Sequence, residues 1–194
     1  MARETSVVTP ERYSEGFSYA GYIEQIKVNK ARFDAFYAGF QLKTEDAVLF
    51  RDLASRPNGP AKMLVLGEDW CGDVVRGLPV LARIAEAAGM EMGIFPRNLN
   101  HDIMCEFLNQ GQWESIPVAV FYTRDHRYIC HWTERPAVAG REMAEIEAAI
   151  RAENPQISEQ EFSRERRART AARAGGWIEA TVAELKDLLT SSVS

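Results

Sequence analysis

The sequence predicts an α/β fold, with a mixed central sheet, helices on both faces of the sheet, and helical extensions at both ends of the chain. Three observations predict it. A short apolar run at 62–67 is followed by helical spacing up to Gly89, which is typical of a buried strand and its crossover helix. Two further strand-like segments, at 115–122 and 127–133, flank a turn. The regions before and after this core carry only helical patterns.

Composition and length favour one domain with additions. The 194 residues are long enough to bury a sizeable core, and 46% hydrophobic with 26% charged residues is typical of a globular protein. The segment 56–60, which contains two prolines and a glycine and is expected to end a helix, marks the main internal boundary. We therefore expect a helical N-terminal extension at 1–59, a core at 60–135 and a helical C-terminal extension at 136–194.

The N-terminal extension is expected to contain two helices. Apolar and aromatic residues recur every three or four positions over 18–40, which predicts one amphipathic packing helix. Thr44, followed by Glu45 and Asp46, predicts the start of the next helix, with the Thr44 hydroxyl capping free amides. That helix ends at the segment 56–60.

The core elements follow from changes in periodicity. A strand at 62–67 leads into a helix at 72–88, and a right-handed crossover would place the strand at 90–97 parallel to the first. A helix at 101–111 then precedes an antiparallel hairpin formed by 115–122 and 127–133.

Three helices are expected in the C-terminal extension. They cover 136–153, 158–176 and 177–192, and the second is expected to end at Gly175 and Gly176. Its arginines alternate with Glu161 and Glu165, which favours a solvated helix with ion pairs over a nucleic-acid surface. The apolar stripes of both extensions would cover the sheet edge or form a homodimer surface.

A short motif, Trp70-Cys71-Gly72-Asp73, lies where the first core strand meets its helix. A thiol at a helix N-terminus faces free amides and the positive end of the dipole, which lower its pKa below the usual value of about 8.5. Arg97 ends the neighbouring parallel strand, so it reaches the same sheet edge and is the expected electrostatic partner of Cys71.

Other charges act on this thiol as well. Glu68, Asp69 and Asp73 would oppose a thiolate, whereas Arg76, one turn into the helix, would favour it. The sequence leaves the net sign open.

These residues resemble the thioredoxin superfamily, since Trp70-Cys71-Gly72 opens a helix after a buried strand and Ile116-Pro117 begins a later strand. In detail, "EDWCGD", "PRN" and "SIPVAVFY" resemble bacterial thioredoxin family proteins in which the second cysteine is often replaced. The resemblance spans 60–135. It implies a thioredoxin-like fold, a cis bond before Pro117 and pairing of the backbone groups of Ser115 and Ile116 with an extended peptide.

The sequence departs from this family at two positions. Val74 stands where a dithiol enzyme carries its second cysteine, so no thiol there can resolve a mixed disulfide. Val65 stands where thioredoxins carry a buried acid.

Two functional hypotheses follow. In the first, Cys71 is the catalytic nucleophile of a monothiol oxidoreductase in cell redox homeostasis, exchanging with a protein disulfide or a low-molecular-weight thiol. In the alternative, the fold is a non-catalytic binding module for a peptide or protein. In either case, the binding residues are expected to be Trp70, Gly72, Asp73, Arg97, Ile116 and Pro117.

No cofactor and no metal are expected. Cys105 and Cys130 are interpreted as small buried hydrophobic residues, and His101 with Cys105 forms only one close ligand pair. Neither a secretion signal nor an apolar run of about 20 residues is recognisable. The number of cysteines is odd, which argues against a framework of structural disulfide bonds. The net charge of −5 also argues against nucleic-acid and membrane partners. These features predict a cytoplasmic protein with reduced thiols.

Overall fold

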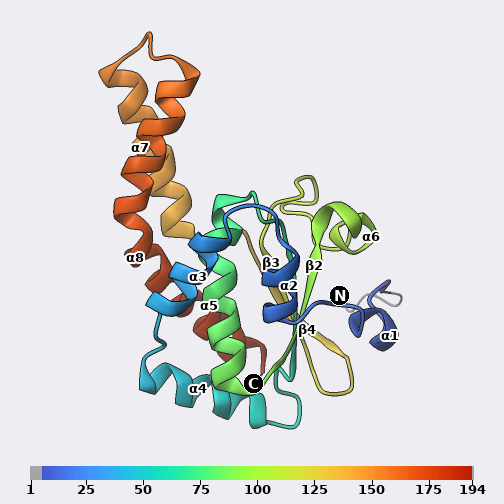
Figure 1. Ribbon diagram of the computed structural model, residues 1–194. Coiled ribbons are helices and arrows are strands. Elements are labelled where there is room, and N and C mark those ends of the chain that lie inside the picture. The colour runs from blue at the N-terminus through green and yellow to red at the C-terminus, as the bar shows by residue number, and fades with distance from the viewer. Residues whose placement is uncertain (1–5, 194) are drawn as a thin grey trace. The chain divides into compact units, whose positions relative to one another are not determined.

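The computed structural model describes residues 6–193 and contains a four-stranded mixed sheet (Figure 1). The strand order is β2-β1-β3-β4, in which β1 and β2 are parallel and the other two pairings are antiparallel. The bounds are Lys62–Gly67 for β1, Glu91–Pro96 for β2, Val118–Tyr122 for β3 and Tyr128–Thr133 for β4. The predicted α/β fold with a mixed sheet is confirmed.

The central strand explains why its sequence is apolar without interruption. Val65 of β1 is paired with Ile94 on one side and Ala119 on the other, and Met63 through Leu66 are fully buried. A strand buried on both faces has no solvent-facing positions for polar residues. The edge strand β4 is less buried and keeps an alternating pattern.

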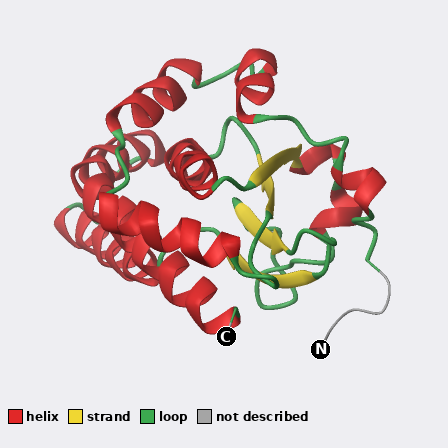
Figure 2. Ribbon diagram, turned by 90° about the horizontal axis from the view of Figure 1, so that it is seen from below, coloured by secondary structure: helices red, strands yellow, loops and turns green. Residues whose placement is uncertain are grey.

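Helix α5, Gly72–Ala88, crosses back over the sheet between β1 and β2. It ends at Gly89, whose φ of 71° is a left-handed conformation that glycine adopts without strain. Helices α1, Pro10–Tyr13, and α6, His101–Met104, lie on the other side of the sheet from α5 in both views (Figures 1 and 2).

The predicted single helix over 18–40 is wrong. The chain forms α2, Tyr19–Gln25, and α3, Lys30–Gly39, separated by an extended link. A carboxylate oxygen of Asp69 accepts the backbone amides of Lys27 and Val28 at 2.8 and 3.1 Å, so these amides are not available to a continuous helix.

The next helix, α4, spans Thr44–Ser55 and ends at the predicted segment, 56–60. Thr44 is its first helical residue and Lys43 is the cap residue, so the expected Thr44 cap is wrong.

The N-terminal segment covers the outer edge of β2. The Phe17 amide donates to the Ile94 carbonyl at 2.9 Å, and the Ile94 amide donates back at 2.8 Å. Gly16 permits this approach, since a Cβ there would lie 2.6 Å from a ring carbon of Phe95. The segment therefore satisfies the backbone amide and carbonyl of Ile94 on this edge.

The expected helix at 101–111 is much shorter. Helix α6 ends at Met104, and the chain then turns through Gln110 and Gly111, both with positive φ. Cys105 follows the helix and is exposed, so the expectation that it is buried is wrong, whereas Cys130 is buried as expected.

At the C-terminal end, two helices replace the three expected. Helix α7 spans Ala137–Glu153, and α8 runs continuously over Glu159–Ser192. The prediction that Gly175 and Gly176 end a helix is wrong. Both have negative φ and solvent around their Cα atoms, so they reduce helix propensity without breaking the hydrogen-bond ladder.

The described chain divides into two compact units. One contains the residues up to Glu134 together with those from Leu185 onward, and the other is Arg135–Glu184. Within the second unit, the Trp177 indole donates to Glu142 at 2.8 Å, and Arg166 pairs with Glu147 at 3.0 Å.

Candidate functional site

Cys71 is the cap residue of α5, directly after the loop that leaves β1. Its φ and ψ of −78° and 122° are extended, and its side chain makes no capping hydrogen bond to the helix. The Cys71 amide donates to the Glu68 carbonyl at 3.2 Å, and the Cys71 carbonyl accepts from Val75 at 2.9 Å. The half-buried thiol therefore lies at the start of a 17-residue helix, where backbone amides are free.

The Ile116-Pro117 loop lies against this thiol. The peptide bond between the two residues is cis, and the Cys71 Sγ donates to the Ile116 carbonyl at 3.6 Å. Gly77 lets the helix approach, because a Cβ at Gly77 would lie 3.4 Å from Cγ of Pro117. Three of the expected site residues, Cys71, Ile116 and Pro117, are thus brought together.

Val74 and Val65 are both fully buried. A Cβ on Gly67, the last residue of β1, would lie only 2.9 Å from Cγ1 of Val74, so the valine fills the space beneath the loop. This position therefore holds a core side chain without a thiol, and the Val65 position holds no acid.

The three acidic residues around Cys71 each have a partner. Glu68 accepts the Asn98 amide at 2.7 Å, Asp69 accepts two amides of the α2–α3 link, and Asp73 forms an ion pair with Arg76. The acids therefore help to hold the loop in place. Asp73 and Arg76 also neutralise each other within the first turn of α5.

Arg97 lies at the expected sheet edge, with its guanidinium 5.5 Å from the Trp70 ring centre. It donates to the Glu114 carbonyl at 3.3 Å and pairs with the Glu114 carboxylate at 3.6 Å. Glu114 also contacts the His101 ring at 3.2 Å. The charge of Arg97 is therefore shared with Glu114, which no sequence motif indicated although it lies only two residues before Ile116.

Trp70 and Gly72 form the exposed rim of the site. The Trp70 side chain is 53% exposed, and Gly72, the first residue of α5, is exposed, with open space where a Cβ would stand. Trp132, by contrast, is 7% exposed on β4 and belongs to the core. The exposed Trp70 indole therefore lies next to Arg97.

Tyr22 is a neighbour that the sequence pattern did not reveal. Burial raises the pKa of its hydroxyl, and the charges of Glu68, Asp69 and Cys71 raise it further. This tyrosine from α2 therefore packs close to the loop, and it stays protonated at physiological pH. Only the tertiary packing of the N-terminal extension places it there.

The remaining cysteines differ in environment. Burial raises the pKa of Cys130 to about 11, so this thiol is protonated at neutral pH, whereas Cys105 is exposed. Over residues 6–193, no group of three or more metal-ligating side chains occurs. No helix in the same range is long and apolar enough to cross a membrane.

The sheet order, the cis bond at Pro117 and a cysteine at the start of α5 define the thioredoxin-like class. The thioredoxin family profile matches residues 16–153, and the chain belongs to this family. No curated protein matches the sequence.

Two solved structures resemble the chain in fold. One is a protein of unknown function from Pseudomonas aeruginosa, with 15% identity, a TM-score of 0.66, and coverage of 95% of this chain and 99% of the other. The second is an HIV epitope scaffold, with 16% identity, a TM-score of 0.66, and coverage of 96% and 99%. At this identity the similarity concerns the fold alone.

Proposed function

We propose that the protein performs monothiol chemistry through Cys71 in cell redox homeostasis in the cytoplasm. The observation that carries the proposal is the position of the Cys71 thiol, half-buried at the start of α5 and 3.6 Å from the Ile116 carbonyl. Free amides and the helix dipole at this position favour a thiolate. The ion pair with Arg76 reduces the opposition of Asp73 to a thiolate, whereas Glu68 and Asp69 accept only neutral amides and keep their negative charge.

The proposed reaction is thiol-disulfide exchange in two steps. The Cys71 thiolate attacks one sulfur of a protein or low-molecular-weight disulfide, forms a mixed disulfide and releases the other sulfur as a thiolate. Because Val74 offers no second thiol, a thiolate from outside attacks the mixed disulfide. This second step frees Cys71 and leaves the outside thiol bonded to the first partner.

Mass spectrometry of the intact protein tests this proposal. Wild type purified without reductant and treated with an aromatic disulfide should carry an adduct at Cys71 that an added thiol removes. Cys71→Ser should lose this adduct, and the matched control Cys105→Ser should retain it. An adduct confined to Cys105 in the wild type would contradict the proposal.

A second candidate is a binding module in which Cys71 is inert. It is favoured by the exposed Trp70 beside Arg97, and by the Ile116 amide, which donates no hydrogen bond within residues 6–193. An extended peptide or a second copy of the chain would supply an acceptor. Binding measured for wild type and Cys71→Ala should then be equal, and loss of binding in the variant would count against an inert cysteine.

A homodimer remains one proposed arrangement for the apolar faces of the helical extensions. Gel filtration with light scattering measures the mass directly. A monomer mass at all concentrations would reject the dimer.

A further inference from the structure

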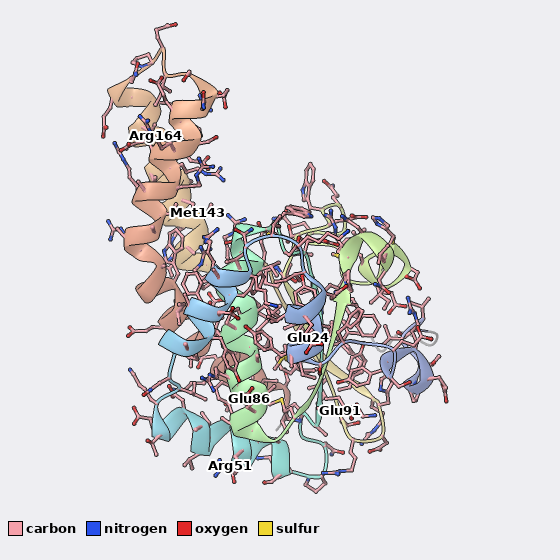
Figure 3. The ribbon with its side chains drawn as sticks, in the orientation of Figure 1. Glu24, Arg51, Glu86, Glu91, Met143 and Arg164 are labelled. Atoms are coloured by element: carbon pink, nitrogen blue, oxygen red, sulfur yellow. The ribbon has the colours of Figure 1, made fainter. Side chains whose placement is uncertain are left out.

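A cavity lies at the end of the sheet opposite to Cys71. It has a volume of about 320 Å³ and is lined by Arg51 of α4, Lys62 at the start of β1 and Arg124 in the β3–β4 turn. Lys62 begins β1, whereas Cys71 lies beyond the loop that follows Gly67, the last residue of the strand, so the length of the strand separates the two sites. Figure 3 labels two lining residues, Arg51 and Glu91, both in the lower part of the view.

Within the described part of the chain, none of the three cations of this cavity forms an ion pair, although Glu91 is the register partner of Lys62 on the neighbouring strand. Arg51 donates Nε to the Ala87 carbonyl at 3.3 Å, and the Lys62 ammonium lies 5.4 Å from the Tyr13 ring centre. Arg124 is exposed. Two arginines and a lysine therefore line one cavity, and each has N–H groups available to donate hydrogen bonds to a ligand.

The acids nearest in sequence to these cations are engaged elsewhere. Asp52, next to Arg51, pairs with Arg56 at 3.5 Å, and Asp125, next to Arg124, pairs with Arg127 at 3.3 Å. Glu91 is the one acid that lines the cavity. Three positive charges against one negative charge give the cavity a local positive charge in a protein whose net charge is −5.

We propose that this cavity binds a small molecule that carries a phosphate group. Two guanidinium groups and one ammonium group can together bind a compact tetrahedral dianion, because they come from three separate elements and surround one space. The volume is at the lower end of the range for small-molecule pockets, about 300–1,000 Å³. The alanines and the glycine in the lining leave this space open, and the Glu91 carboxylate would accept a hydrogen bond from a hydroxyl or amino group on the rest of the ligand.

An NMR titration of the protein with inorganic pyrophosphate at low salt tests the proposal. The measured quantity is the change in the backbone amide chemical shifts. Saturable shifts should centre on Lys62, Glu91 and Arg124. Arg124→Gln should weaken binding about tenfold, as expected for a lost hydrogen bond between charged groups. The matched control Arg127→Gln removes a neighbouring arginine that is already paired, and it should change the affinity by less than about twofold. Glu91→Gln should strengthen binding.

Three outcomes would overturn the proposal. These are the absence of saturable shifts in the wild type, equal weakening by Arg124→Gln and Arg127→Gln, and tighter binding of malonate than of pyrophosphate, which would assign the site to carboxylates. Thermal melting of each variant confirms that it is folded. Adduct formation at Cys71 should be unaffected by these substitutions, so this test is independent of the proposed redox function.

Discussion

Gly67→Ala is expected to destabilise the protein through Val74. The added Cβ would lie 2.9 Å from Cγ1 and 3.4 Å from Cγ2 of Val74. Val74 cannot move away easily, because it is fully buried and a helical valine strongly prefers one side-chain rotamer. Overpacking of this kind costs about 1–3 kcal/mol, whereas loss of a glycine stabilises by about 0.4–1 kcal/mol through the unfolded chain. The net expectation is a loss of about 1–2 kcal/mol.

A double-mutant cycle measures the coupling between positions 67 and 74, with the free energy of unfolding of each variant determined in urea. Val74→Ala alone should cost about 1.5–3 kcal/mol, and the double variant should lose about 1 kcal/mol less than the sum, since the alanine at 67 would occupy the vacated space. Gly72→Ala is the control, because a Cβ at that position meets nothing. A Gly67→Ala protein as stable as wild type, or strictly additive variants, would refute the packing argument.

Three further predictions concern other parts of the chain. Replacing Gly175 and Gly176 by alanine should stabilise α8 by about 0.5–1 kcal/mol each, and a melting temperature that does not rise would contradict the helical role of these residues. Burial of the Cys130 thiol favours its protonated form, so wild-type stability should fall as the pH rises from about 9 to about 11. The free energy of unfolding of Cys130→Ala, measured in urea, should lack this decrease between about pH 9 and 11. Identical pH profiles of stability for wild type and Cys130→Ala would contradict the prediction. Lys186→Met should lower the melting temperature, because it leaves the buried Asp46 carboxylate unpaired, and Asp46→Asn in the same chain should recover part of the loss. Equal melting temperatures for wild type and Lys186→Met would contradict that role.

The core of the fold was predictable because its signals are local. The apolar run of β1, the helical spacing of α5 and the terminating Gly89 each depend on neighbouring residues. The parallel pairing of β1 and β2 follows from chain handedness. These features were sufficient to place Arg97 at the sheet edge that Cys71 shares.

Features that depend on distant contacts were not predictable. The break after α2 depends on Asp69, which lies about 40 residues further along the chain. The exposure of Cys105 depends on a turn that has no strong sequence signal, and the pairing of Arg97 with Glu114 appears only when two loops meet. The double glycine wrongly predicted a helix end, because helix ends depend on the surrounding contacts as well as on composition.

The most direct test of the central claim is the alkylation rate of Cys71 against pH, measured peptide by peptide with mass spectrometry. Exposed Cys105 serves as the reference thiol within the same molecule. If Cys71 is a working nucleophile, it should react faster than Cys105 at pH 6–7, and the midpoint of its rate profile should lie at lower pH. A Cys71 midpoint at or above that of Cys105 would contradict the redox account and favour the binding module.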